Sequence, residues 1–212
     1  MGNRAIITTQ ENFENNGIGI YLHWNGGRDS VEGFLKYCEL KGYRNPTEDS
    51  YGWARLCQII SNFFGGSTSI GINTISNLPS GEYCDNGVYF IEGWEIVGRK
   101  FFDNCEEQAC YPLNEMLESI DERQPAEEQL GAYLMAEEVD AADLKVGDEV
   151  YIRDWDGNVK IVTILDFGDG RIVNGYDTTG LPYANIVGGN LGKDNCNNYI
   201  RDKRVKIAKR VA

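Results

Sequence analysis

The stretch from Ile18 to Tyr43, IGIYLHWNGGRDSVEGFLKYCELKGY, decides the fold because it combines a strand, a glycine turn and a helix without a gap. The first residues alternate as they do in a strand, with Ile18, Ile20 and Leu22 on one face. Apolar side chains then recur at i, i+3, i+4 and i+7, the stripe of a helix packed on a core, at Val31, Phe34, Leu35 and Cys38. We therefore expect a strand that leads directly into a helix over residues 30–41.

The turn between this strand and helix has a composition that suits an anion: Asn25, Gly26, Gly27, Arg28, Asp29 and Ser30. Two glycines allow a sharp turn, and the first N–H groups of the helix would point into it. Arg28 can pair with a phosphate, and Asp29 can cap the helix together with Glu32 in a capping box. The six residues resemble the pyrophosphate loop of ATP-pyrophosphatase enzymes, Ser-Gly-Gly-x-Asp-Ser, and depart from it at the first position.

The surroundings of the turn do not match that enzyme family. Its loop belongs to a parallel, doubly wound sheet, whereas the segments after Tyr43 indicate a helix, a long loop and an antiparallel hairpin. We therefore interpret Gly26, Gly27 and Asp29 as chiefly structural. A nucleotide- or anion-binding module that uses the turn, as a sponge or as an ATP-pyrophosphatase-like enzyme, remains the alternative.

The rest of the first 140 residues predicts an α+β domain with a mainly antiparallel sheet and two to three helices. Further helices are expected over 51–64 and 112–123, from their apolar stripes. Further strands are expected over 4–9 and 69–73, with a polar loop over 10–16. A tight turn at Gly93-Trp94 joins two β-rich runs, 88–92 and 95–101, into a hairpin.

A different pattern fills residues 141–212, where short β-rich runs are separated by turns such as Asp156-Gly157 and Asp169-Gly170. The expected strands cover residues 149–154, 159–167, 171–175, 183–187 and 204–208. Five short strands within such a length favour a small closed barrel of SH3-like type. The sequence therefore predicts two domains, 1–140 and 141–212, with a boundary near residue 140.

Charge is distributed unevenly along a chain whose net charge is −13. Between Asp103 and Asp140 twelve acidic residues accompany a single basic residue, Arg123, for a net charge of −11. The segment from Arg201 to Arg210 is the opposite pole, with six basic residues, one aspartate and a net charge of +5. A solvated surface that keeps the protein soluble explains most acidic proteins but explains less well so local a block.

These two poles supply the candidate partner-binding residues. The predicted acidic face consists of Glu106, Glu107, Glu115, Glu118, Asp121 and Glu122. The predicted basic tail consists of Arg201, Lys203, Arg204, Lys206, Lys209 and Arg210, and it could make a weak contact with nucleic acid. The acidic face, in contrast, suits a positively charged protein surface.

Catalytic and metal-binding constellations are weak. The lone His23 has no carboxylate at a recognisable spacing, so we interpret it as a structural histidine. The six cysteines lack CxxC pairs, so we expect reduced thiols, no metal site and no cofactor. No membrane span or secretory signal is recognisable, and we expect a cytoplasmic protein.

Three segments together resemble a family of small acidic accessory proteins of phages and mobile elements of Gram-positive bacteria: YLHWNGGRDSVEGFLKYCELKGYR, YGWARLCQIISNFFGG and DNGVYFIEGWEIVGR, within residues 1–125. The resemblance implies a genetic setting in which inhibitors of host defence are common, including anti-restriction and anti-CRISPR proteins, and a location in the bacterial host's cytoplasm. It implies no catalytic residues.

Three functions of different classes follow. The first is a non-enzymatic inhibitor whose acidic face occupies the basic groove of a host nucleic-acid-binding protein, such as a defence nuclease. The second is the anion-binding module described above. The third is a structural or regulatory phage protein that binds a protein through the C-terminal barrel, or nucleic acid through residues 201–210.

Overall fold

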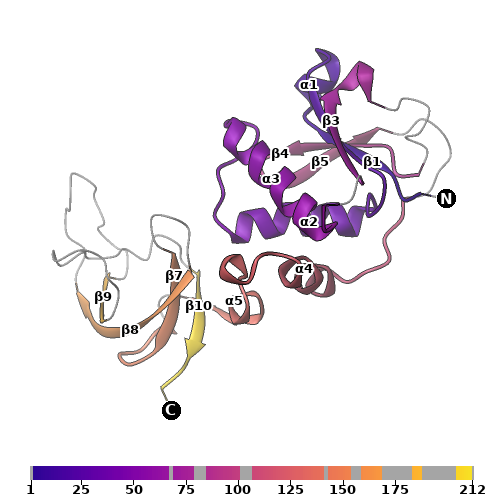
Figure 1. Cartoon of the computed structure of the whole chain (residues 1–212). Helices are drawn as coiled ribbons and strands as arrows, with labels where there is room; N and C mark the ends of the chain where they lie inside the picture. The colour runs from indigo at the N-terminus through magenta and orange to yellow at the C-terminus, as the bar shows by residue number, and fades with distance from the viewer. Residues whose placement is uncertain are drawn as a thin grey trace. The chain divides into compact units, whose positions relative to one another are not determined.

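The computed structural model describes residues 2–66, 69–78, 85–100, 107–140, 143–153, 159–168, 183–187 and 204–211, and every structural statement below concerns these residues. The chain is a mixed α+β protein with two sheets, as the sequence predicts (Figure 1). It divides into two compact units, Met1–Gln129 and Leu130–Ala212.

The sheet of the first unit has the strand order β3-β2-β1-β4-β5. The strands are β1 (Ala5–Thr8), β2 (Ile18–Leu22), β3 (Ile70–Thr74), β4 (Val88–Glu92) and β5 (Glu95–Lys100). Strand β1 pairs in parallel with β4, and the pairs β1–β2, β2–β3 and β4–β5 are antiparallel. Three antiparallel pairs around one parallel pair do not make the doubly wound sheet on which a pyrophosphate loop is normally mounted.

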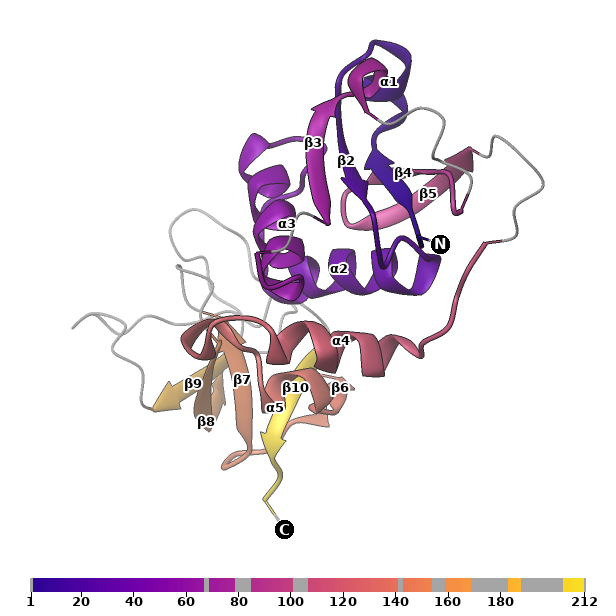
Figure 2. The same cartoon turned by 45° about the vertical axis from the view of Figure 1, so that its right-hand side comes forward.

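Helices α2 (Arg28–Leu40) and α3 (Ser50–Phe63) lie on one side of this sheet (Figures 1 and 2). Both helices begin and end within two residues of the predicted limits. The apolar stripes from which they were predicted are buried, and Phe34 and Ile60 are 0% exposed. Asp49 caps α3, and its carboxylate accepts a hydrogen bond from the Tyr51 N–H at 2.8 Å.

The opposite face of the sheet carries a second cluster, in which Ile6, Val88 and Phe90 pack with Leu78. It is covered by the 3₁₀ helix η1 (Ile75–Asn77) and by a short helix, α1 (Gln10–Glu14). The prediction of a polar loop over 10–16 was therefore wrong. Thr9 caps α1, accepting from the Asn12 N–H at 3.0 Å, and the Phe13 ring packs edge-on against Phe90. This single apolar anchor is too little periodicity to indicate a helix from sequence.

Helix α4 (Leu113–Glu122) packs on α2 on the side away from the sheet (Figure 2). Gly33 makes the close approach possible, because a Cβ there would lie 2.5 Å from Cγ of Met116. The Tyr37 hydroxyl of α2 donates to the Asp121 carboxylate of α4 at 2.6 Å, and both side chains are buried. Burial and this neighbouring carboxylate raise the pKa of Tyr37 well above its usual value.

The segment after α4 also belongs to the first unit. The buried Gln124 side chain donates to the Ile120 and Ile59 carbonyls at 3.0 and 3.3 Å. Glu128 is the last residue of the 3₁₀ helix η3 (Ala126–Glu128), and its carbonyl accepts a hydrogen bond from the Lys41 ammonium at 2.6 Å. These bonds explain why the units divide after Gln129 and not near residue 140.

The second unit contains helix α5 (Ala132–Met135) and a sheet of order β6-β10-β7-β8-β9. Its strands are β6 (Glu138–Asp140), β7 (Glu149–Arg153), β8 (Val159–Gly168), β9 (Tyr183–Val187) and β10 (Arg204–Lys209), all paired antiparallel. The core is formed by Val139, Leu144, Val150, Val162, Ile164, Val205 and Ile207. Val139 joins this core from before the predicted boundary, so β6 belongs here.

Strands β6 and β9 are the two edges of this sheet, and their described residues are not paired with each other. Four of the five predicted strands are present within a residue or so of the expected limits. The strand expected over 171–175 and the turns at Asp156-Gly157 and Asp169-Gly170 lie outside the described residues. Closure into an SH3-like barrel therefore stays a prediction.

Candidate functional site

The glycine turn is built by close approach of backbone segments. The Gly26 N–H donates to the Asn3 carbonyl at 2.8 Å, and a Cβ at Gly26 would lie 2.6 Å from the backbone nitrogen of Ala5. A Cβ at Gly27 would lie 2.5 Å from the Gln108 carbonyl oxygen. Both positions therefore require glycine because a Cβ would clash with neighbouring backbone atoms.

The start of α2 is occupied by the chain itself. The Arg28 N–H donates to the Gln108 carbonyl at 3.0 Å, and the Ser30 N–H donates to Oδ1 of Asp29 at 2.8 Å. An anion would need these same donors. The side chain of Asn25, whose φ is 52°, donates to the Ser30 hydroxyl at 3.4 Å. The Gln108 carbonyl thus takes the Arg28 N–H donor that a pyrophosphate would use.

Asp29 has a different role from the predicted one. The N-cap residue of α2 is Gly27, and Asp29 lies in the first turn of the helix. Its Oδ2 atom accepts from the N–H groups of Cys110 and Tyr111 at 2.7 and 2.8 Å. The capping box with Glu32 is therefore wrong, because the Asp29 carboxylate is turned toward a segment that lies far away in sequence. It fastens residues 108–111 to the helix.

The charge of Arg28 is already shared between two carboxylates. Its guanidinium lies 3.1 Å from Glu32 and 2.7 Å from Glu107. Burial alone would lower the pKa of Arg28, but these two carboxylates more than offset it and raise the pKa. Arg99 on β5 also lies 3.3 Å from Glu107. Glu107 is therefore half-buried and paired, and it contributes little free charge to the acidic face predicted from sequence.

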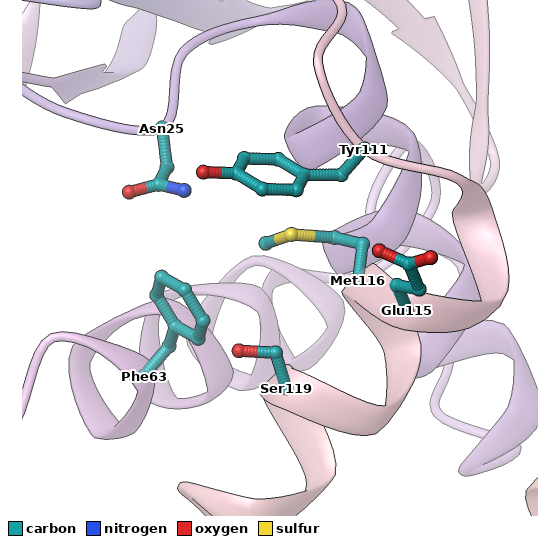
Figure 3. A pocket seen from close by; sticks show the side chains of 6 residues that line it. All are labelled: Asn25, Phe63, Tyr111, Glu115, Met116 and Ser119. Atoms are coloured by element: carbon teal, nitrogen blue, oxygen red, sulfur yellow. The ribbon is translucent and has the colours of Figure 1, made fainter.

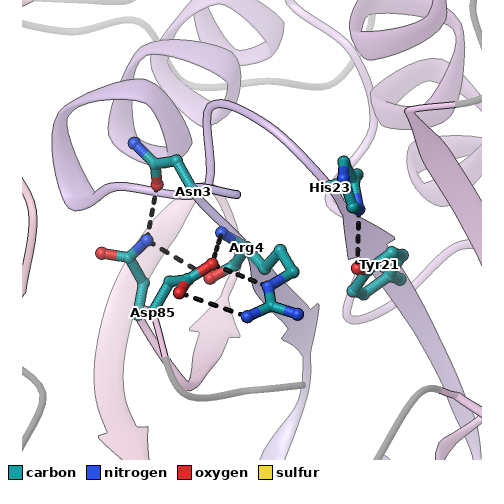
Figure 4. A network of polar contacts seen from close by, with 6 residues as sticks. Asn3, Arg4, Tyr21, His23 and Asp85 are labelled. Carbon is teal, nitrogen blue, oxygen red and sulfur yellow. Dashed lines mark hydrogen bonds and ion pairs between the residues drawn. The ribbon is translucent and has the colours of Figure 1, made fainter. Parts of the chain in front are cut away.

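A polar network holds the same segment, and Figure 4 draws the part of it around Arg4 and Asp85. The fully buried Asn86 side chain donates to Asn3 and to the Arg4 carbonyl, and accepts from the Gln108 N–H at 2.9 Å. Arg4 forms an ion pair with Asp85 at 2.7 Å. Burial would raise the pKa of Asp85, but the bonds from Arg4 outweigh it and lower the pKa. Sequence reasoning missed this network because residues 74–86 indicated only a loop.

His23 lies at the end of β2 with a hydrogen-bond partner of its own. Its Nδ1 atom is 3.1 Å from the Tyr21 hydroxyl (Figure 4), and its ring packs edge-on against Trp24. Its backbone N–H donates to the Ser69 carbonyl at 2.8 Å. These contacts match those of a structural histidine.

The outward face of α4 carries three carboxylates, Glu115, Glu118 and Glu122, which we call the α4 acidic face. All three are exposed, and none forms an ion pair with any residue within the described ranges. Asp121 was assigned to the same surface from sequence, and that was wrong, because it is 6% exposed and bonded to Tyr37. Glu106 lies outside the described residues.

A cavity of about 300 Å³ adjoins this face (Figure 3). Its walls come from the glycine turn, from α3, and from α4 with the residues just before it: Asn25, Phe63, Tyr111, Glu115, Met116 and Ser119. Met116 is 3% exposed and forms part of the wall, whereas Tyr111 is 55% exposed. Sequence analysis did not find this site, because the residues come from three separate segments.

The basic tail is in part a structural strand. Arg204–Lys209 forms β10, which lies between β6 and β7. The Lys206 ammonium donates to the Tyr133 and Leu134 carbonyls at 2.8 and 3.1 Å, so part of its hydrogen-bonding capacity is used within the second unit. Lys209 and Arg210 are exposed. Arg201 and Lys203, and the side chain of Arg204, lie outside the described parts.

Within the ranges that the structure describes, no three His, Cys, Asp or Glu residues are grouped in a way that could hold a metal ion. No helix among them has the length and apolar character that crossing a membrane requires. Comparison with known proteins finds no family model, no curated protein and no solved structure that matches the chain.

Proposed function

We propose that the protein is a non-enzymatic binding protein whose α4 acidic face engages a positively charged surface of a nucleic-acid-binding protein. The observation that carries the proposal is the set of three exposed carboxylates on one side of α4 that have no ion-pair partner among the described residues. The opposite side of the helix is buried through Met116 and Ile120, so the carboxylates are held on a fixed support.

The mechanism is competition for a basic groove. Carboxylates along a helix present negative charge where a nucleic-acid backbone would present phosphates, so they attract the same Lys and Arg side chains. Such attraction speeds encounter and weakens as salt screens it. Binding of the partner is therefore expected to fall as the ionic strength rises and to exclude DNA or RNA from the groove.

The setting we propose is a phage or mobile element of a Gram-positive host, in which the target is a defence nuclease of anti-restriction or anti-CRISPR relevance. This part rests on the resemblance of three segments within residues 1–125 to accessory proteins of such elements. In the same proposal, the protein acts in the host cytoplasm and the C-terminal sheet closes as an SH3-like barrel.

The nucleotide-binding alternative is less well supported by the geometry. The Arg28 and Ser30 N–H groups are bonded within the protein, and two carboxylates share the Arg28 charge. A phosphate at the turn would have to displace the Gln108 carbonyl. We therefore do not assign catalysis or nucleotide storage to residues 25–30.

The test is a charge reversal with a matched control. In one variant Glu115, Glu118 and Glu122 are all changed to lysine. In the control, three exposed glutamates elsewhere in the first unit, Glu11, Glu48 and Glu92, are changed in the same way, so both variants have the same net charge. Retention of a nucleic-acid-binding protein from bacterial lysate should be lost only in the α4 variant. Equal retention by both variants would refute the proposal.

A further inference from the structure

The cavity beside α4 combines a carboxylate with apolar and aromatic walls (Figure 3). We infer that it is an anchor pocket for one arginine side chain of the protein partner, with Glu115 as the counter-charge. This inference rests on the proposed function and deepens it, because it names the group on the partner that the acidic surface recognises.

The sign of the charge selects a cation. Glu115 is the one ionisable wall residue whose side chain is charged at neutral pH, and it forms no ion pair in the described part of the chain. The nearby cation, Arg28, is already shared between Glu32 and Glu107. A phosphate or carboxylate ligand would therefore meet repulsion, whereas a guanidinium would gain a charge-assisted hydrogen bond.

The walls favour a guanidinium over an ammonium ion. Tyr111 and Phe63 offer ring surfaces on which a flat cation can stack, and the thioether of Met116 lies between them (Figure 3). The Asn25 side-chain N–H₂ donates to the Ser30 hydroxyl, and in Figure 3 this nitrogen, and not the amide oxygen, faces Tyr111. The acceptors for a cation are therefore the Glu115 carboxylate and the Ser119 hydroxyl, to which a planar guanidinium can donate through separate N–H groups while its face stacks on a ring.

The size of the cavity agrees with one side chain. Its volume of about 300 Å³ lies at the lower limit of small-molecule sites, which run from roughly 300 to 1,000 Å³. Tyr111 and Glu115 are exposed in the free protein, so the partner's surface around an inserted arginine would have to exclude the water, as the rim of an interface hot spot does. Glu118 and Glu122 would then attract further basic residues around it.

The experiment uses the full-length protein labelled with ¹³C at its methionine methyl groups. The chain has three methionines, Met1, Met116 and Met135, so the Met116 signal reports on the pocket and the Met135 signal serves as an internal control. The probes are N-acetyl-argininamide, its uncharged isostere N-acetyl-citrullinamide, and pyrophosphate. For a ligand of this size we expect a Kd on the order of 1 mM.

The inference predicts a saturable shift of the Met116 methyl signal with argininamide and none with citrullinamide or pyrophosphate. Glu115→Gln should weaken binding about tenfold, since it removes the charged acceptor, and Tyr111→Ala should weaken it through loss of stacking. Glu48→Gln, an exposed glutamate outside both the pocket wall and the α4 acidic face, should leave the Kd unchanged. All three substituted side chains are exposed, so folding should be preserved.

Three results would overturn the inference: no Met116 shift with argininamide, equal binding of citrullinamide, or unchanged binding in Glu115→Gln. Failure here is distinguishable from failure of the proposed function. If argininamide does not bind but the triple lysine variant still loses its partner, the acidic face acts without an arginine anchor. If argininamide binds but the triple variant keeps its partner, the pocket exists and the proposed interface is wrong.

Discussion

Replacing Asp29 by alanine tests whether the glycine turn is a structural joint. Asp29 is 9% exposed, and its carboxylate accepts three backbone N–H groups, from Ser30, Cys110 and Tyr111, at 2.7 to 2.8 Å. A hydrogen bond to a charged group contributes about 1.5–3 kcal/mol, but less where water can replace the acceptor, as at the exposed Cys110 and Tyr111. Loss of a negative charge in the first helical turn costs about 0.3–1 kcal/mol.

Together these contributions predict that Asp29→Ala lowers the free energy of unfolding by about 2–4 kcal/mol. The measurement is urea unfolding followed by tryptophan fluorescence, because three of the four tryptophans, Trp24, Trp53 and Trp94, lie in the first unit. Glu32→Ala is the control on the same turn of α2; its ion pair with Arg28 is half-exposed, so we expect a change below about 0.5 kcal/mol.

A loss below about 0.5 kcal/mol in Asp29→Ala would refute the assigned role, because it would mean that the three accepted bonds contribute almost nothing. Adding pyrophosphate gives a second test of whether the glycine turn is structural. If the turn is filled by residues 108–111, adding pyrophosphate leaves the unfolding midpoint of the parent protein unchanged. A rise in the midpoint that Arg28→Ala abolishes would favour the anion-binding alternative.

Two further predictions concern stability. Gly27→Ala should destabilise the first unit by about 1–3 kcal/mol, because the new Cβ would lie 2.5 Å from a backbone oxygen. Gly71→Ala is the control and should cost much less, because the nearest atom to its Cβ lies at 3.8 Å. Equal urea midpoints for the two variants would contradict this prediction. Burial would raise the pKa of Asp148, but its bonds from the Val211 and Lys145 N–H groups outweigh burial and lower the pKa. The stabilisation by Asp148 is therefore present above the unfolded-state pKa of about 3.9 and is lost as the pH falls through the lower folded-state pKa. Asp148→Asn should lower the melting temperature at neutral pH, and it should make the fall of melting temperature at acid pH less steep. An equally steep fall in that variant would count against this prediction.

The helices and strands that carry a strong apolar period could be predicted from sequence. The apolar stripe of α2, which includes Phe34 and Leu35, and the alternation along β2 can be read from neighbouring residues alone, and most of these side chains are buried in the structure. The exceptions are instructive. Helix α1 has a single apolar anchor, Phe13, so no window of sequence could show its period.

The candidate site was harder to predict because it depends on pairings between distant residues. Asp121 has the local appearance of an exposed acid on an amphipathic helix, but Tyr37, 84 positions earlier, supplies the donor that permits its burial. Asp29 has the local appearance of a helix cap, and its carboxylate instead accepts from residues more than 80 positions later. Only three-dimensional proximity distinguishes these roles.

The unit boundary shows the same limit. Composition changes near residue 140, yet Gln124 and Lys41 tie the residues up to Glu128 to the first unit, and Val139 packs in the second core. A change in pattern indicates where strands begin, whereas a boundary depends on which core buries each side chain.

The central claim is that the α4 acidic face is the interaction surface. The most direct measurement is retention of a nucleic-acid-binding protein from nuclease-treated lysate of a Gram-positive bacterium, at low and at moderate salt. It compares the parent with the triple lysine variant at Glu115, Glu118 and Glu122 and with the control variant of equal charge. We predict retention by the parent and the control that declines with salt, and none by the α4 variant at an unchanged melting temperature. Retention by the α4 variant equal to that of the parent would contradict the claim.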